Sequence, residues 1–192
     1  MSRASILENI RRNKPSLELL PEIAEFKSDS KDLLELFKKN LSQVGGQAIE
    51  IAEKEIATNI KEHFGQLKFI VSNDDSLNIA TKKISEITDL KEFDSLDLVV
   101  LRCGFGVAEN GAVWVSSNDI SHRVLPFIAE HAVFIVPKNE IVSNMHEAYK
   151  RINLLRTNGF GAFISGPSKT ADIEQSLVIG AHGSKSLIVY LI

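Results

Sequence analysis

The sequence of 192 residues contains a single cysteine, Cys103. One thiol cannot form an internal disulfide, and by itself it cannot supply the cysteine ligands of a zinc or iron–sulfur site. A chain without disulfides is typical of a reducing compartment, so we expect a cytoplasmic protein. We also expect Cys103 to be a small buried apolar residue, with a reactive thiol as the alternative.

Other features are scarce in this sequence. Lysine and arginine number 22 against 25 acidic residues, for a net charge of −3, and aromatic residues make up only 7%. This balance argues against a nucleic-acid binder, which would carry a basic surface or an aromatic platform. No apolar run approaches the roughly 18 residues of a membrane span. The histidines lack the spacing of common zinc motifs, so we predict no metal site.

The remaining composition, 44% hydrophobic and 24% charged, is that of a globular protein with a sizeable core. The first twelve residues lack the apolar centre of a signal peptide, and they alternate charged and apolar residues like a short amphipathic helix. Pro15 and Pro21 then mark a linker. We therefore predict an N-terminal helix and linker over residues 1–29 and one α/β domain over residues 30–192.

The fold prediction rests on apolar strands that alternate with amphipathic helices. Strands are expected at 47–51, 67–71, 98–101, 112–115, 132–136, 160–165 and 187–191, and helices at 30–44, 52–64, 143–155 and 171–179. This alternation predicts an α/β domain with a mostly parallel sheet. The strands 98–101 and 112–115 are joined by too few residues for a crossover helix, so we expect them to pair antiparallel.

One loop with suitable chemistry runs from Gly166 to Thr170, between an expected strand and an expected helix. Ligands of open α/β sheets gather at the carboxyl ends of strands. Gly166, Ser168, Lys169 and Thr170 supply backbone amides, two hydroxyls and a cation at that position. This combination suits a phosphate or a carboxylate.

Lys169 is the informative residue of that loop. A cation near a helix N-terminus costs about 0.3–1 kcal/mol unless an anion lies nearby. The anion could be a ligand, or it could be Asp172 or Glu174 one turn later, which would make the loop an ordinary helix cap. Both interpretations stay open. The spacing of a Walker phosphate loop is absent.

A second loop joins Gly104 and Gly106 to Glu109, Asn110 and Gly111. The glycines allow close approach to a ligand or a sharp turn, but the third glycine of a dinucleotide fingerprint is missing. Asn-Gly is typical of hairpin turns, which favours a plain turn with a solvated Glu109. The functional alternative places Glu109 in a cleft as acid, base, nucleophile or ligand anchor.

A histidine, His182, is the third candidate, just before the last expected strand. It could orient a substrate, although a histidine in such a loop more often makes only a local hydrogen bond.

Two of these regions together resemble a known family. The run from Gly166 to Glu174, with Gly180 and His182-Gly183 after it, resembles the C-terminal signature of the LUD domain, the family of lactate-utilisation protein C. Residues 106–112 resemble its Ala-Glu-Thr-Gly turn after a strand. The chain departs from the family where Lys169 replaces arginine, Asn110 replaces threonine and Ser184 replaces proline. Losing arginine removes bidentate anion binding but keeps the charge.

The resemblance implies a fold similar to the NagB/RpiA/coenzyme A transferase group, a three-layer α/β sandwich with an N-terminal helical arm. It also implies a role in oxidising L-lactate to pyruvate in the bacterial cytoplasm, alongside iron–sulfur partner proteins. We expect this chain to be a non-redox component without a cofactor of its own, which binds a small carboxylate or phosphate and could form a homo-oligomer.

Two other functions stay open at this point. Glu109-Asn110-Gly111 is similar to the Glu-x-Gly segment that bears the nucleophile of one coenzyme A transferase family, so the chain could be such an enzyme or a related sugar-phosphate isomerase. The 166–170 loop could instead serve a regulatory module that senses a small anion. Under the lactate-utilisation hypothesis, Glu109, Lys169 and His182 would line one small-anion site. Sequence separation alone does not show whether they and Asp172 converge on one cleft.

Overall fold

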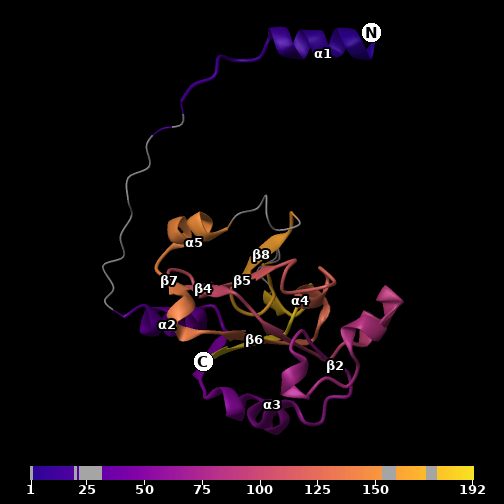
Figure 1. Ribbon diagram of the computed structural model, residues 1–192, viewed down its shortest axis with the longest axis vertical. Helices are drawn as coiled ribbons and strands as arrows, with labels where there is room; N and C mark the ends of the chain where they lie inside the picture. The colour runs from indigo at the N-terminus through magenta and orange to yellow at the C-terminus, as the bar shows by residue number, and fades with distance from the viewer. Residues whose placement is uncertain (1, 20, 22–31, 153–158, 172–176) are drawn as a thin grey trace.

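The structure is a computed structural model that describes residues 2–19, 21, 32–152, 159–171 and 177–192. Its first element is α1 (Arg3–Arg12), the expected amphipathic helix, which begins after Ser2 and has no buried residue. Figure 1 shows α1 apart from the α/β domain. The predicted linker lies partly outside the described residues, and the division at residue 30 stays a prediction.

A five-stranded sheet, parallel throughout, forms the centre of the domain. Its strand order is β1-β11-β6-β3-β2. The strands are β1 (Gln47–Glu50), β11 (Ser186–Leu191), β6 (His131–Val136), β3 (Leu98–Arg102) and β2 (Ile70–Ser72). The inner strands are continuous apolar runs because they are covered on both faces. The prediction of an α/β fold with a mostly parallel central sheet is confirmed.

A second sheet has four strands in the order β7-β4-β5-β8. The strands are β7 (Ile141–Val142), β4 (Phe105–Val107), β5 (Ala112–Ser116) and β8 (Gly161–Ile164). The predicted antiparallel pairing of 98–101 with 112–115 is wrong. The chain changes sheets after β3, and the three-residue strand β4 is the antiparallel partner of β5. Such a short strand carries no periodic signal that a sequence pattern could reveal.

The two sheets and the helices stack in layers (Figure 1). Helix α3 (Ile56–Phe64) covers one face of the parallel sheet, where Ile60 packs with Val100 and Tyr190. The opposite face carries the largest core, which it shares with the second sheet, with α2 (Leu33–Gln43) and with α4 (Leu125–Ile128). Helices therefore flank the central sheet, as expected. The prediction of three layers did not include the second sheet.

The outer face of the second sheet is covered by α5 (Met145–Arg151), which begins at the cap residue Asn144. Short 3₁₀ helices complete the connections: η1 (Glu53–Glu55), η2 (Asp75–Leu77), η3 (Ile84–Glu86), η4 (Leu90–Ser95) and η5 (Lys138–Glu140). Within the described ranges, no helix has both the length and the apolar character needed to cross a membrane.

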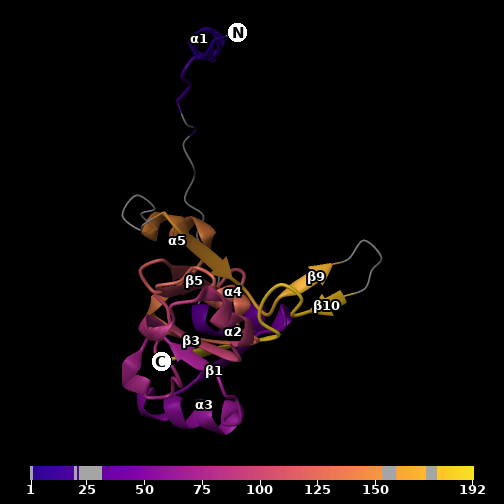
Figure 2. The same cartoon turned by 90° about the vertical axis from the view of Figure 1, so that its right-hand side faces the viewer.

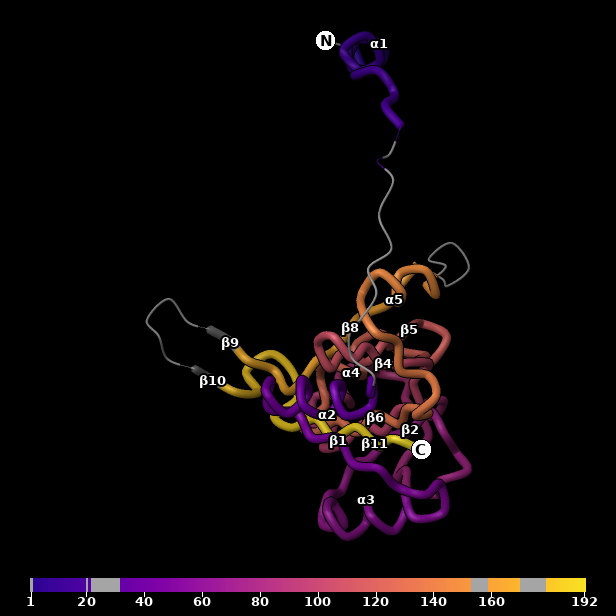
Figure 3. Tube along the Cα trace, turned by 90° about the vertical axis from the view of Figure 1, so that its left-hand side faces the viewer, coloured from indigo at the N-terminus to yellow at the C-terminus, as the bar shows by residue number. Residues whose placement is uncertain are grey.

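A two-stranded ribbon projects from the domain, as Figures 2 and 3 show. Its strands, β9 (Lys169–Ala171) and β10 (Leu177–Ile179), are antiparallel, with Lys169 opposite Ile179. The helix predicted over 171–179 is therefore wrong at both ends, and residues 172–176 lie outside the described residues. Gly166 and Gly180, both with positive φ, bracket the ribbon, and backbone pairing between its strands replaces helical hydrogen bonds.

Candidate functional site

The segment 166–169 and the segment 180–184 lie side by side. The backbone amide of Ser168 donates to the carbonyl of Ser184 at 2.8 Å, and the amide of Gly180 donates to the carbonyl of Ser168 at 3.0 Å. A Cβ on Gly183 would lie 3.0 Å from the Cβ of Ser168. The two halves of the C-terminal signature thus form one surface.

A cavity of about 310 Å³ opens at that surface, which we call the Lys169 cavity. Gly166, Ser168, Lys169 and His182 line it on the polar side. Its apolar wall includes Pro126, Phe127, Phe163 and Leu187. This volume lies at the small end of ligand-binding cavities, which measure roughly 300–1,000 Å³. The cavity is therefore sized for a small molecule, and its polar groups could fix an anion.

The ammonium of Lys169 lies beside the end of α2. A Cβ on Gly45, just past the helix C-cap Val44, would be 3.4 Å from Lys169 Nζ. The negative end of the α2 dipole attracts this cation. The prediction that Lys169 lies near a helix N-terminus is wrong, because Lys169 is the first residue of strand β9. Among the described residues no carboxylate pairs with Lys169, and Asp172 lies outside them.

His182 is an exposed residue that borders two cavities. The Lys169 cavity lies on one side, and a second cavity of about 480 Å³ lies on the other. We call the second one the Asp94 cavity, because carboxylates of Asp94, Asp97 and Glu130 line it. His182 can therefore reach a ligand in either cavity. Thr170 pairs with Val178 in the ribbon, but its side chain is not described.

Glu109 does not line either of these cavities. Its carboxylate accepts a hydrogen bond from the amide of Met145 at 2.8 Å, in the first turn of α5. Its backbone carbonyl accepts from Asn40 Nδ2 at 2.9 Å. The side chain is exposed and supports the start of a helix, which agrees with the turn interpretation of this segment.

The neighbouring turn residues are also engaged within the protein. Asn110 Oδ1 accepts from the amide of Ala112 at 3.1 Å, and the Asn110 carbonyl accepts from Ser165 Oγ at 2.6 Å. Gly104 is exposed, with no atom within 4 Å of its Cβ position. A Cβ on Gly106 would approach Ile141 Cδ1 at 2.8 Å. Gly104, Gly106 and Asn110 do not line the Lys169 cavity, although Ser165, which Asn110 contacts, does.

The Lys169 cavity lies at an unexpected end of the parallel sheet. Ala132, near the start of β6, and Leu187, near the start of β11, are part of its wall. It thus borders the amino ends of the strands, whereas the rule for open α/β sheets points to their carboxyl ends. The 166–170 loop does follow a strand, as predicted, but that strand, β8, belongs to the second sheet and not to the parallel one.

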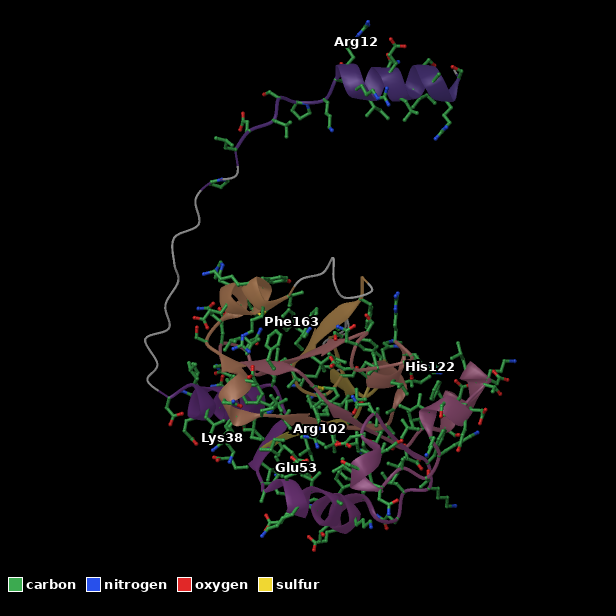
Figure 4. The ribbon with its side chains drawn as sticks, in the orientation of Figure 1. Arg12, Lys38, Glu53, Arg102, His122 and Phe163 are labelled. Carbon is green, nitrogen blue, oxygen red and sulfur yellow. The ribbon has the colours of Figure 1, made fainter. Side chains whose placement is uncertain are left out.

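At the carboxyl end of β3 a charged cluster occupies the position that the rule favours. The Arg102 guanidinium donates to Asp74 at 2.6 and 2.9 Å and to Glu53 at 2.5 Å (Figure 4). The hydrogen bond to Glu53 is the main reason that the pKa of Arg102 is raised above its ordinary value. Sequence patterns missed this cluster, since its members are far apart in the chain. Its one guanidinium pairs with two carboxylates, which leaves one negative charge in excess, and these ion pairs make it a structural feature.

Next to Arg102, Cys103 is buried as predicted. Burial, with a smaller contribution from the charge of Asp119, raises the pKa of its thiol well above the ordinary value. The thiol therefore stays protonated and unreactive. Within the described residues, no group of three or more histidine, cysteine or acidic side chains is arranged to hold a metal ion.

These observations define an α/β protein with a small cavity, part polar and part apolar, beside two glycine-containing segments. Residues 68–192 match the LUD domain, so the chain belongs to the LUD domain family. The structure is also similar to the crystal structure of a DUF162 family protein from Deinococcus radiodurans. That comparison has a TM-score of 0.67 at 16% identity and covers 83% of this chain and 95% of the other. At this identity the likeness shows the fold alone.

Several relatives bear the name lactate utilization protein C. The protein of Oceanobacillus iheyensis is 23% identical over 88% of this chain and 84% of its own length. That of Anoxybacillus flavithermus is 28% identical over 81% and 68%. Lactate utilization protein C 1 of Bacillus mycoides is 34% identical over 50% of this chain, and there the chain spans 43% of the relative.

Proposed function

We propose that this chain is a lactate-utilisation protein. It would act in the bacterial cytoplasm as the non-redox component of a system that oxidises L-lactate to pyruvate, with iron–sulfur proteins as its partners. The observation that carries the proposal is the match to proteins named lactate utilization protein C over more than four fifths of the chain. A relationship to the NagB/RpiA/coenzyme A transferase group is part of the same proposal.

The Lys169 cavity is the proposed binding site for a small carboxylate or phosphate. Lys169 supplies a cation that no carboxylate neutralises among the described residues, and Ser168 and His182 supply polar groups on the same wall. A charge-assisted hydrogen bond to an ionised ligand is roughly twice as strong as a neutral one. The apolar side chains of Phe163 and Leu187 would face the carbon atoms of the ligand.

The two enzyme alternatives have less support from the geometry. A glutamate nucleophile has to be desolvated and aimed at the bound substrate. Glu109 is exposed, accepts a hydrogen bond from Met145 and does not line the Lys169 cavity. The non-redox assignment rests on Cys103, a single buried thiol, so electrons would have to pass through a partner protein.

Calorimetry with L-lactate, pyruvate and inorganic phosphate tests the binding site. We expect Lys169→Ala to weaken the binding of whichever anion binds by about tenfold or more, the equivalent of about 1.4 kcal/mol. Lys169→Arg keeps the charge and should retain binding. Lys138→Ala, which removes a lysine paired with Glu50, is the matched control and should bind as the wild type does. Equal binding by Lys169→Ala and the wild type would contradict the site.

A separate experiment tests the role in lactate oxidation. Lactate-dependent dye reduction is measured in extracts that contain the iron–sulfur proteins of the same bacterium, with and without this chain. We expect the rate to fall when the chain is removed and to recover when it is added back. An unchanged rate would contradict the role, whatever the calorimetry shows about anions.

A further inference from the structure

Helix α1 has an apolar side that nothing covers. Ile6, Leu7 and Ile10 are exposed, and the last turn carries Arg11 and Arg12. A helix of ten residues is marginal in water on its own, since isolated helices need roughly 12–15 residues. A basic amphipathic helix of this length gains stability from a surface that is both apolar and acidic.

The Asp94 cavity offers such an acidic surface. Three acidic residues and one lysine, Lys185, line it, and Lys185 pairs with Glu130 at 2.6 Å. Asp97 accepts hydrogen bonds through Oδ2 from the amides of Lys68 and Phe69. Among the described residues, Asp94 makes no hydrogen bond or ion pair. The cavity therefore holds more negative than positive charge.

Apolar side chains surround the same cavity. The domain exposes four large apolar side chains within its described part: Leu90, Phe127, Tyr149 and Ile179. One of them lines the cavity, and two others are near its lining residues in the sequence. Phe127 lines it, Leu90 belongs to η4, which also provides Asp94, and Ile179 directly precedes the lining residue Gly180. Only Tyr149, on α5, lies elsewhere.

We propose that α1 docks into the Asp94 cavity of its own chain, with its apolar side on Phe127 and its arginines toward the carboxylates. The arginines and apolar side chains of α1 are complementary to the carboxylates and apolar side chains of the Asp94 cavity. Twenty residues separate Arg12 from Leu33. They can span about 70 Å at roughly 3.5 Å each, which exceeds the width of a domain this size. Because this connection keeps α1 on the same chain as the cavity, the effective concentration of α1 at the cavity is about millimolar.

Docking has a consequence for the neighbouring cavity. Phe127 and His182 line both cavities. If α1 occupied the Asp94 cavity, it would therefore cover side chains that a ligand in the Lys169 cavity could contact. Helix α1 would then be an autoinhibitory segment. The docking itself does not depend on the proposed function, because it requires no ligand.

Cysteine crosslinking in the full-length chain tests the docking. The test protein carries Ile10→Cys with Phe127→Cys, and the matched control carries Ile10→Cys with Tyr149→Cys. The exposed fraction is 42% for Phe127 and 59% for Tyr149, so simple accessibility favours the control. The native thiol of Cys103 is buried and protonated and does not interfere.

Under mild oxidation, we expect the Phe127 pair to form an intramolecular disulfide about tenfold faster than the control, at a rate independent of protein concentration. Adding Asp94→Lys to the Phe127 pair should slow it toward the control rate. Equal rates for the two pairs would overturn the proposal. Covalent dimers that increase with concentration would overturn it too, since they place the arm on a second copy. A pair of Ile10→Cys with Leu90→Cys repeats the test should Phe127→Cys fail to fold.

Discussion

Two glycine-containing segments of this chain, 104–111 and 166–184, differ in whether their polar residues line a cavity. In segment 104–111 the glycines bring the backbone against neighbouring elements, and a Cβ on Gly111 would collide with Leu41 of α2. In segment 166–184 Gly166 and Gly183 also approach neighbouring groups closely, at Val44 and Ser168, but a cavity opens beside them. Glycines in a loop therefore indicate close approach of the backbone, and the approaching group can be the protein itself.

The polar side chains of the two segments differ in the same way. Glu109 and Asn110 accept hydrogen bonds from backbone amides of their own surroundings. Lys169 and His182 make no such bond among the described residues, and both line the Lys169 cavity. Polar groups with partners inside the protein hold a fold together, whereas exposed polar groups beside a cavity can exchange water for a ligand.

Alanine at Gly111 should disturb the closed segment most. Gly111 has φ of +65°, and a Cβ there would lie 2.5 Å from the amide nitrogen of Leu41, which is backbone and cannot easily move. We expect the free energy of unfolding to fall by about 3 kcal/mol, measured by urea titration. Gly104→Ala is the matched control, because no atom lies near its Cβ, and it should change stability by about 0.5 kcal/mol or less. Similar losses in both variants would contradict this account of the segment.

Alanine at Gly166 should affect both stability and binding. Gly166 has φ of +77°, and a Cβ there would lie 2.7 Å from the carbonyl oxygen of Val44, at the end of α2. We expect a loss of about 2 kcal/mol in unfolding free energy. Anion binding should weaken as well, because the loop that carries Lys169 must move away from α2. A variant that is destabilised but binds anions as the wild type does would show that this contact does not position the cavity.

Much of the fold follows from patterns that extend over several residues. The apolar runs at 98–101, 132–136 and 187–191 are strands of the parallel sheet, as predicted, since burial on both faces requires continuous apolar sequence. The Asn110-Gly111 turn is likewise present, because its positive φ at glycine is a local property.

The errors concern features that tertiary contacts decide. The ends of the expected helix over 171–179 are strands, because pairing of Lys169–Ala171 with Leu177–Ile179 overrides local propensity. Strand β4 has three residues, too few to show a period. The position of the Lys169 cavity at the amino ends of β6 and β11 depends on which sheet β8 joins, and that pairing leaves no trace in the sequence of β8 itself.

Of the three sites, Glu109 should show the smallest loss of unfolding free energy when it is substituted. This substitution also distinguishes the two segments most clearly. Glu109→Ala removes the carboxylate that accepts from the Met145 amide, which should lower the free energy of unfolding by about 0.5–1 kcal/mol. Glu109→Gln retains an oxygen acceptor and should lose less. Because Glu109 does not line the Lys169 cavity, both variants should bind anions in calorimetry as the wild type does, while Lys169→Ala does not. Loss of anion binding in Glu109→Gln with unchanged stability would instead give this carboxylate a direct role in the site, and the two segments would then have to act on one ligand.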